Sequence, residues 1–311
     1  MRRLLAPAFL FVLAAGQAFG WGCEGHAIVA LIARAHLSPA ASASVDRILK
    51  EGPIDPALKR FCQNLPADPM VQAASWPDDI RTAERNGAWH FVDIPLTVSS
   101  GTKLDEWCPP IGPSENGKDR PGCVTNAIEY QASILRDPKA TPADRAAAVR
   151  YIIHFTGDMH QPLHVSDNDD KGGNCTAMSF FDEEKPANLH SIWDYKILAR
   201  ELEAKHKTLA EYAAMLDQQF APQWQAWTAG SKPQDWAWEG HTVAIRSTYG
   251  KLNPNIPFVK TFQNNCDAEK DAVTALHIAV GDEYVNQNAP VVDEQLAKAG
   301  FRLAAMLNSI L

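Results

Sequence analysis

The sequence predicts a mainly α fold, in which many helices and one short β-hairpin form a single domain. Apolar residues recur every three to four positions over much of the 311-residue chain, which is the spacing of amphipathic helices. Strand-like composition is confined to short pieces, of which Met178 to Phe181 is the clearest. No solenoid repeat and no linker divides the chain, so one domain is expected from residue 21 to residue 311.

The first twenty residues have the pattern of a signal peptide. Two arginines precede an apolar run from Leu4 to Ala15, and the small residues Ala18 and Gly20 stand where a signal peptidase cleaves. The run is too short for a comfortable membrane span and no later stretch is long enough, so no stable membrane association is expected. Cleavage would leave Trp21 as the first residue of a secreted or periplasmic protein.

Helical periodicity marks the start of the expected domain. One helix is expected from Gly25 to Leu37, which places His26 in its first turn, and a second from Pro39 to Leu49. The prolines between residues 53 and 69 indicate irregular chain. Residues 89–95 have the composition of a short β-like segment.

Helical patterns resume after residue 124. The C-terminal region from Asp267 is expected to form two long helices broken around Pro290, because proline cannot continue a helix. Thr141 and Asp144 suit a capping box at the start of the central helix. Tryptophans between residues 224 and 238 are expected to pack between helices rather than to stack on bases. The other expected helices are Thr125 to Arg136, Pro142 to Asp158, Ile192 to His206, Thr208 to Phe220 and Glu239 to Tyr249.

Charge and cysteine content limit the functional classes. A formal net charge of −8 argues against a protein that holds nucleic acid on a basic surface, but not against one that handles phosphates through bound metal. Six cysteines in an exported chain predict disulfides. Cys108 and Cys123 flank a loop rich in Pro and Gly, residues 97–122, and are expected to pair. Four cysteines cannot be paired from the sequence, namely Cys23, Cys62, Cys175 and Cys266.

Residues 151–164 carry the densest group of possible metal ligands. His154 and Asp158 are four residues apart on a predicted helix that ends before Pro162, so both lie on one face within reach of a common ion. His164 follows the break, where the chain can turn it back toward that face or toward a neighbouring one. A single pair of this kind is usually an ion pair on a helix surface.

The same four-residue spacing recurs at His190 and Asp194, and two such pairs with a flanking histidine predict more than one metal ion. Imidazole and carboxylate groups without paired thiolates suit zinc in a catalytic site. Five histidines stand beside Asp or in motif-like settings, namely His26, His90, His154, His164 and His190. A structural role is expected for the other five, which are His36, His160, His206, His241 and His277.

Six short segments stand in order between residues 21 and 200. They are Trp21 to His26, Trp76 to Arg81, Trp89 to Asp93, His154 to His164, Gly172 to Asn174 and His190 to Asp194. In composition and spacing they resemble the zinc-dependent single-strand nucleases of fungi, plants and bacteria, which form one superfamily with the zinc phospholipases C. The C-terminal third adds only a helical pattern.

The resemblance implies three zinc ions in a cleft of a mainly α fold. Asp158 would bridge the first ion to the second. The second ion would also take the α-amino nitrogen and carbonyl oxygen of Trp21, which are available only after signal cleavage. The other ligands would be Asp78, His90 and His154 at the first ion, His26 at the second, and His164, His190 and Asp194 at the third.

The resemblance also implies an endonuclease that hydrolyses single-stranded RNA and DNA to 5′-phosphorylated products through a hydroxide bridging two ions. Cleavage of 3′-nucleotides would be a further activity. Arg81 would neutralise charge on the phosphoryl group, although a surface salt bridge with Asp78 or Asp79 is an alternative. Phe91 and Asp93 would stack on and hydrogen-bond a nucleobase, beside Asn174. Nucleic acid and nucleotides would be substrates of a monomer with no protein partner.

Two other functions stay open at this point. One is a phospholipase C, against which Asp194 stands where those enzymes typically carry Glu. The other is a non-catalytic exported zinc-binding protein, against which no candidate ligand is missing. Pro95 replaces an acidic residue of some fungal members, so base preference stays undefined. Asn174 also opens a glycosylation sequon, which is discounted for a site residue.

Overall fold

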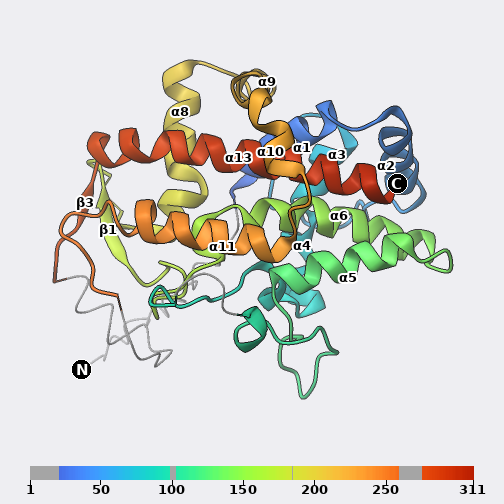
Figure 1. Cartoon of the computed structure of the whole chain (residues 1–311), viewed down its shortest axis with the longest axis horizontal. Helices are drawn as coiled ribbons and strands as arrows, with labels where there is room; N and C mark the ends of the chain where they lie inside the picture. The colour runs from blue at the N-terminus through green and yellow to red at the C-terminus, as the bar shows by residue number, and fades with distance from the viewer. Residues whose placement is uncertain (1–20, 99–102, 184, 259–274) are drawn as a thin grey trace, which may run out of the picture.

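The computed structural model describes residues 21–98, 103–183, 185–258 and 275–311. Helices dominate these residues and strands are few, which confirms the mainly α fold (Figure 1). The predicted signal peptide, Cys266 and residues 267–274 lie outside the described residues. The N-terminal helices are α1 (Cys23–Ala35), α2 (Pro39–Glu51), α3 (Pro69–Ala74), α4 (Trp76–Glu84), α5 (Val124–Arg136) and α6 (Pro142–Met159).

The rest of the domain consists of short helical turns and further α-helices. Short 3₁₀ turns occur at Gly87–His90, Leu104–Glu106, Pro162–His164 and Ala221–Gln223, and π-helical turns at Ile192–Lys196 and Ala244–Thr248. The α-helices are α7 (Leu189–Ser191), α8 (Ile197–Lys205), α9 (Leu209–Phe220), α10 (Trp224–Thr228), α11 (Pro233–Val243) and α13 (Asp282–Ile310).

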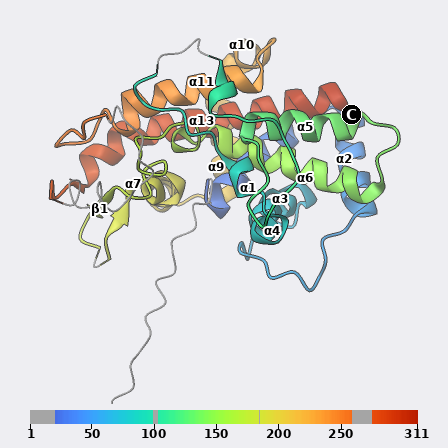
Figure 2. The same cartoon turned by 90° about the horizontal axis from the view of Figure 1, so that it is seen from below.

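Helix α13 runs the length of the molecule, with α8 and α9 on one side of it and α5, α6 and α11 on the other (Figure 1). Helix α1 packs against α13, α9, α3 and α6, while α6 packs against α5, α2, α3 and α4. Seen from below, α3 and α4 lie beside α6 (Figure 2). The helices α1, α4 and α6, which carry candidate ligands, therefore meet inside the bundle.

Local sequence signals explain where several helices begin. The hydroxyl of Ser38 accepts a hydrogen bond from the Ala41 amide, and the hydroxyl of Thr141 accepts one from the Asp144 amide, as expected for N-caps. Asp68 caps α3 in the same way, so the prediction of irregular chain up to Pro69 is wrong at its end: Pro69 occupies the first turn of a helix.

The predicted break at Pro290 does not occur, because one helix continues from Asp282 to Ile310. An interior proline removes one backbone hydrogen bond and costs roughly 3 kcal/mol. Buried residues on both sides, among them Val285 and Val292, hold the helix against the core and offset this cost. The side-chain amide of Asn288 also donates to the carbonyl of Tyr284. Tertiary packing outweighs the local signal here.

The predicted β-like segment at residues 89–95 is only partly extended. Trp89 and His90 lie in a 3₁₀ turn, and the chain becomes extended after Phe91. Pro95 forms an isolated parallel bridge with Asp167. This pairing brings the segment that follows His90 beside the loop that follows α6.

The expected hairpin is present and belongs to a three-stranded sheet in the order β2, β1, β3. Strand β1 (Ala177–Phe180) pairs antiparallel with β2 (Ala187–Asn188) and parallel with β3 (Ala279–Val280). Helix α7, which carries His190, starts directly after β2. The sheet thus positions the start of the helix that carries His190, the first residue of the second predicted pair.

Disulfides and tryptophans behave as structural groups. Cys108 pairs with Cys123 as predicted, Cys23 pairs with Cys62, and Cys175 is also disulfide-bonded. The rings of Trp224 and Trp227 contact Phe301 of α13, with centroids 5.1 and 6.0 Å apart, which confirms that they pack between helices. Among the described residues, no helix combines the length and apolarity needed to cross a membrane.

Candidate metal centre

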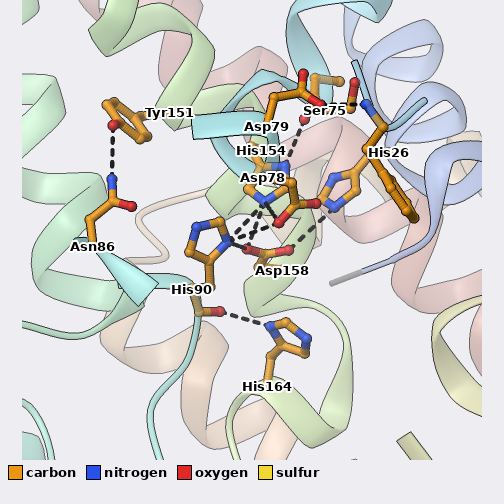
Figure 3. Close-up of polar contacts among 12 residues, drawn as sticks. His26, Ser75, Asp78, Asp79, Asn86, His90, Tyr151, His154, Asp158 and His164 are labelled. Carbon is orange, nitrogen blue, oxygen red and sulfur yellow. Dashed lines mark hydrogen bonds and ion pairs between the residues drawn. The ribbon is translucent and has the colours of Figure 1, made fainter. Parts of the chain in front are cut away.

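His154 and Asp158 lie one turn apart on α6, at the centre of the bundle. Both side chains are fully buried, and Asp158 Oδ2 lies 3.1 Å from His154 Nε2. Figure 3 shows His26, His90 and Asp78 pointing at the same point from other elements. The helix therefore presents its predicted polar face to an internal site rather than to solvent.

The first cluster consists of Asp78, His90 and His154. Asp78 lies in the first turn of α4, and His90 ends the 3₁₀ turn that follows. Asp78 Oδ1 is 3.7 Å from both His90 Nδ1 and His154 Nε2, and the two imidazole nitrogens are 3.0 Å apart. One carboxylate oxygen and two ring nitrogens thus surround a common point.

The second cluster joins His26 of α1 to His154 and Asp158. Asp158 Oδ1 is 3.3 Å from His26 Nε2, whereas Oδ2 is 3.0 Å from His90 Nδ1. The two oxygens of Asp158 therefore face different clusters. Sequence reasoning missed Gly157: a Cβ there would lie 2.8 Å from His26 Nδ1, so only glycine leaves room for this imidazole.

Trp21 lies beside the second cluster. Its side chain is fully buried, and a Cβ at Gly157 would lie 3.8 Å from Trp21 Cδ1 as well as against His26. The amide of Gly22 donates to the carbonyl of Asp194 at 2.8 Å. The residue predicted to become the N-terminus is thereby held between the second cluster and the segment that carries Asp194.

The third cluster consists of His164, His190 and Asp194. His164 follows α6 in a 3₁₀ turn, His190 lies in α7, and Asp194 lies in the π-helical turn after it. His190 Nε2 is 3.2 Å from His164 Nε2 and 3.3 Å from Asp194 Oδ2. Three further predicted ligands, which come from three separate elements, therefore meet in this third cluster.

In three histidines, the hydrogen bond that Nδ1 makes determines which ring nitrogen carries the proton. The Nδ1 atoms of His154, His164 and His190 donate to the carbonyls of Ala74, His90 and Gly172 at 2.6, 2.7 and 2.6 Å. In the neutral rings the Nε2 atoms consequently carry lone pairs and point into the clusters. Backbone carbonyls commonly orient metal-binding histidines in this way.

These donor sets fit metal cations. In the third cluster, two lone-pair nitrogens and a carboxylate face one another at close range, an arrangement that a cation between them would stabilise. Among the described residues, Asp78 Oδ1, Asp158 Oδ1 and His26 Nε2 are buried without a hydrogen-bond partner. Buried polar atoms seldom stay unpaired, and coordination would satisfy all three.

The pKa shifts of the cluster residues also favour a bound cation. Desolvation raises the pKa of Asp78 and Asp194, and nearby carboxylates add to both shifts. Desolvation also lowers the pKa of His90 to about 4. For His154, desolvation is outweighed by the charges of Asp158 and Asp78, which raise its pKa to about 9. A divalent ion would compete with the proton that these carboxylates stabilise on His154.

The other predicted site residues lie around the first cluster. The charge of Arg81, on α4, reaches both Asp78 and His90: it opposes the rise that desolvation causes in the pKa of Asp78 and adds to the fall that desolvation causes in the pKa of His90. Asp79, the alternative partner of Arg81, accepts a hydrogen bond from Arg60 Nε at 2.5 Å. Phe91 follows His90 directly, is half-buried, and its carbonyl accepts a hydrogen bond from the Val124 amide.

Asp93 and Asn174 lie on the two neighbouring loops. Asp93 is exposed to solvent, but desolvation by the protein around it and the charge of Asp170 raise its pKa to about 6. Asn174 donates from its side chain to the Lys171 carbonyl within the loop that presents Gly172 to His190. The expected role of Asn174 rests on its place in this loop.

Histidines assigned to structure lie apart from the clusters. His160 is buried, donates to the Thr156 carbonyl and accepts from Arg302. His241 pairs with Ser166 and the Val98 carbonyl. His36 pairs with Asp217 and stacks on Trp224. These contacts account for the three rings without a ligand role.

The chain is similar to known proteins over most of its length. The S1/P1 nuclease family model matches residues 21–311. Endonuclease 2 of Arabidopsis thaliana is 30% identical over 303 residues, which cover 96% of this chain and 92% of that protein. Nuclease S1 of Aspergillus oryzae is 26% identical over 333 residues, covering 100% and 98%.

Nuclease P1 of Penicillium citrinum is 27% identical over 303 residues, covering 93% of this chain and 97% of that protein. These relatives extend over nearly the full length of both chains, and their shared description is nuclease. With a family model that spans the whole described domain, the chain belongs to the S1/P1 nuclease family, hydrolases that act on the phosphodiester bonds of nucleic acids.

Proposed function

We propose that the mature chain, beginning at Trp21, is an exported monomeric endonuclease that uses three zinc ions to hydrolyse single-stranded RNA and DNA. Its products would carry 5′-phosphates, and 3′-nucleotides would be a second class of substrate. The observation that carries the proposal is the convergence of buried lone-pair nitrogens and carboxylate oxygens into three adjoining clusters.

The three ions are assigned by cluster. Asp78, His90 and His154 bind the first, His26 with the amine and carbonyl of Trp21 the second, and His164, His190 and Asp194 the third. Asp158 would contact both of the first two ions, since its two oxygens face different histidines at 3.0 and 3.3 Å. Nitrogen and oxygen ligands with few donors per cluster suit zinc in open, catalytic sites.

When bound, such ions supply an activated water and withdraw electron density from the phosphoryl group. The protein residues arrange the remaining chemistry. Asp158 sets the separation of the first two ions, and Arg81, next to that cluster, neutralises negative charge on the phosphoryl oxygens as a planar donor. An ion held by Asp194, His164 and His190 would stabilise the leaving oxygen.

A base pocket at Phe91 gives the preference for single strands. Phe91 follows the ligand His90, so a nucleobase stacked on its ring would place its phosphate near the first cluster. Asp93 and Asn174 hydrogen-bond the base edge. A base can reach such a ring only after leaving its duplex stack, which costs free energy in double-stranded substrates.

The test of the proposed function compares two phosphodiester classes. Purified mature protein should hydrolyse single-stranded DNA and RNA, leave phosphatidylcholine intact, lose activity with a chelator and recover it with zinc. Hydrolysis of phosphatidylcholine in preference to nucleic acid would support a phospholipase C. Binding of zinc without either activity would support a non-catalytic protein.

Phe91→Ala should lower activity on single-stranded DNA about five- to a hundredfold, because one lost base–aromatic stack is worth roughly 1–3 kcal/mol. Zinc content should stay unchanged, since the ring supplies no ligand. Phe220→Ala is the matched control, a half-buried phenylalanine that packs on Trp227 away from the clusters. Zinc falling in step with activity in Phe91→Ala would mean that Phe91 only packs beside His90.

A further inference from the structure

Gln161 is a fully buried glutamine just after the ligand helix α6, and the proposed ligand set does not use it. Its side-chain oxygen accepts a hydrogen bond from the Leu163 amide at 2.6 Å. Its side-chain nitrogen donates to Asp194 Oδ1 at 2.6 Å. One uncharged side chain therefore contacts two segments that supply the third cluster.

The orientation of the Gln161 amide follows from its partners. The Leu163 backbone amide can only donate, so the group facing it is the oxygen, and the NH₂ group must face Asp194. Glutamine thereby caps the 3₁₀ turn Pro162–His164, which carries His164, while it donates to a carboxylate on the π-helical turn. Among residue types of this size, glutamine combines a donor and an acceptor without a charge.

The contact divides the two oxygens of Asp194 between two tasks. Oδ1 accepts from Gln161, whereas Oδ2 lies 3.3 Å from His190 Nε2 inside the third cluster. The backbone carbonyl of Asp194 is held separately by the Gly22 amide. With Oδ1 occupied, the carboxylate has one oxygen directed at the cluster and little freedom to rotate.

We propose that Gln161 is a positioning residue for the third metal ion, acting by holding Asp194 with Oδ2 aimed at that ion. The inference rests on the proposed three-ion function. Removing partners that orient metal ligands typically costs 10- to 100-fold in metal affinity. The loss should be confined to the third ion, because the side chain of Gln161 hydrogen-bonds to Leu163 and Asp194, which lie outside the first two clusters. The backbone bond from its amide to the Asp158 carbonyl does not depend on the side chain.

Two substitutions separate positioning from simple capping. Gln161→Met removes both hydrogen bonds at similar volume. Gln161→Glu keeps an acceptor for the Leu163 amide but turns a carboxylate oxygen toward Asp194 in place of the donor. If Gln161 acts on Asp194, both variants should weaken the third ion. If it only caps the 3₁₀ turn, Gln161→Glu should bind zinc like the wild type, which would overturn the inference.

The experiment measures zinc retained per chain during dialysis against graded chelator, with folding checked by circular dichroism. Wild type should hold three ions, and each Gln161 variant should release one at a free-zinc concentration about 10- to 100-fold higher while retaining two. Gln131→Met, which replaces a buried glutamine of α5, should match wild type, and Asp194→Ala should lose the same single ion.

Equal retention of three ions in wild type and both Gln161 variants would overturn the inference and leave the proposed function intact. Wild type holding fewer than three ions would overturn the proposed function, and the inference with it. If Gln161→Met does not fold, Gln161→Glu, which preserves the cap, decides the result alone.

Discussion

Asp158→Asn should lower nuclease activity more than any other single ligand substitution, by more than about a hundredfold, which corresponds to roughly 2.7 kcal/mol in the barrier. Its two oxygens face His26 on one side and His90 with His154 on the other. Asparagine retains one oxygen but presents an NH₂ group, which cannot ligate, to one of the two clusters. Two ions and the water they share should therefore be disturbed together.

The measurement is kcat/KM on single-stranded DNA for Asp158→Asn beside His26→Ala and Asp194→Asn. Asp293→Asn serves as the matched control, because this buried carboxyl accepts a hydrogen bond from Tyr212 at 2.6 Å and is in none of the clusters. Activity of Asp158→Asn within about tenfold of wild type would be incompatible with a bridging ligand. A larger loss in either comparison variant would shift the central role to another cluster.

Two extra residues ahead of Trp21 should abolish binding of the second ion and nearly all turnover. A free α-amino group has a pKa of about 8, so it loses its proton to a metal at little cost near neutral pH. Extension converts it to an amide, whose nitrogen has no available lone pair. The Trp21 side chain is fully buried between α1 and Gly157, next to His26, and the proposal assigns the Trp21 amine to the same ion as His26.

The test compares mature protein with a version extended by Gly-Ser at the N-terminus, matched for fold by circular dichroism. Gly-Ser added after Leu311 is the control and should leave zinc content and kcat unchanged. The N-terminal extension should cost one zinc per chain together with activity. Equal zinc and equal turnover in both extended proteins would rule out coordination by Trp21 and leave His26 without its predicted companion.

The proximity of His154 and Asp158 was predictable because short-range spacing determines which side chains share a helix face. His154 and Asp158 are four residues apart, and α6 does place both in one cluster. The cap at Thr141 was equally local, since Ser and Thr hydroxyls satisfy amides within the first turn. Features decided within one turn of helix could therefore be deduced without knowledge of the tertiary structure.

Other features depend on contacts between distant segments and were missed. Pro290 carries a strong signal for a helix end, but buried residues on both sides keep α13 continuous. The need for glycine at position 157 appears only once His26, from another helix, lies against it. Likewise, the Gln161 amide gains its meaning from Asp194, 33 residues away. The periodicity of a single segment holds no information about such partners.

Elemental analysis of freshly purified mature protein tests the central claim most directly. The three clusters contain every predicted ligand except Trp21, two of them share His154, and in each the donor atoms are close enough to share one ion. The expected result is close to three zinc ions per chain, with activity lost as they are removed and restored as zinc is returned. Full activity with one metal ion per chain, or with none, would contradict the three-ion account.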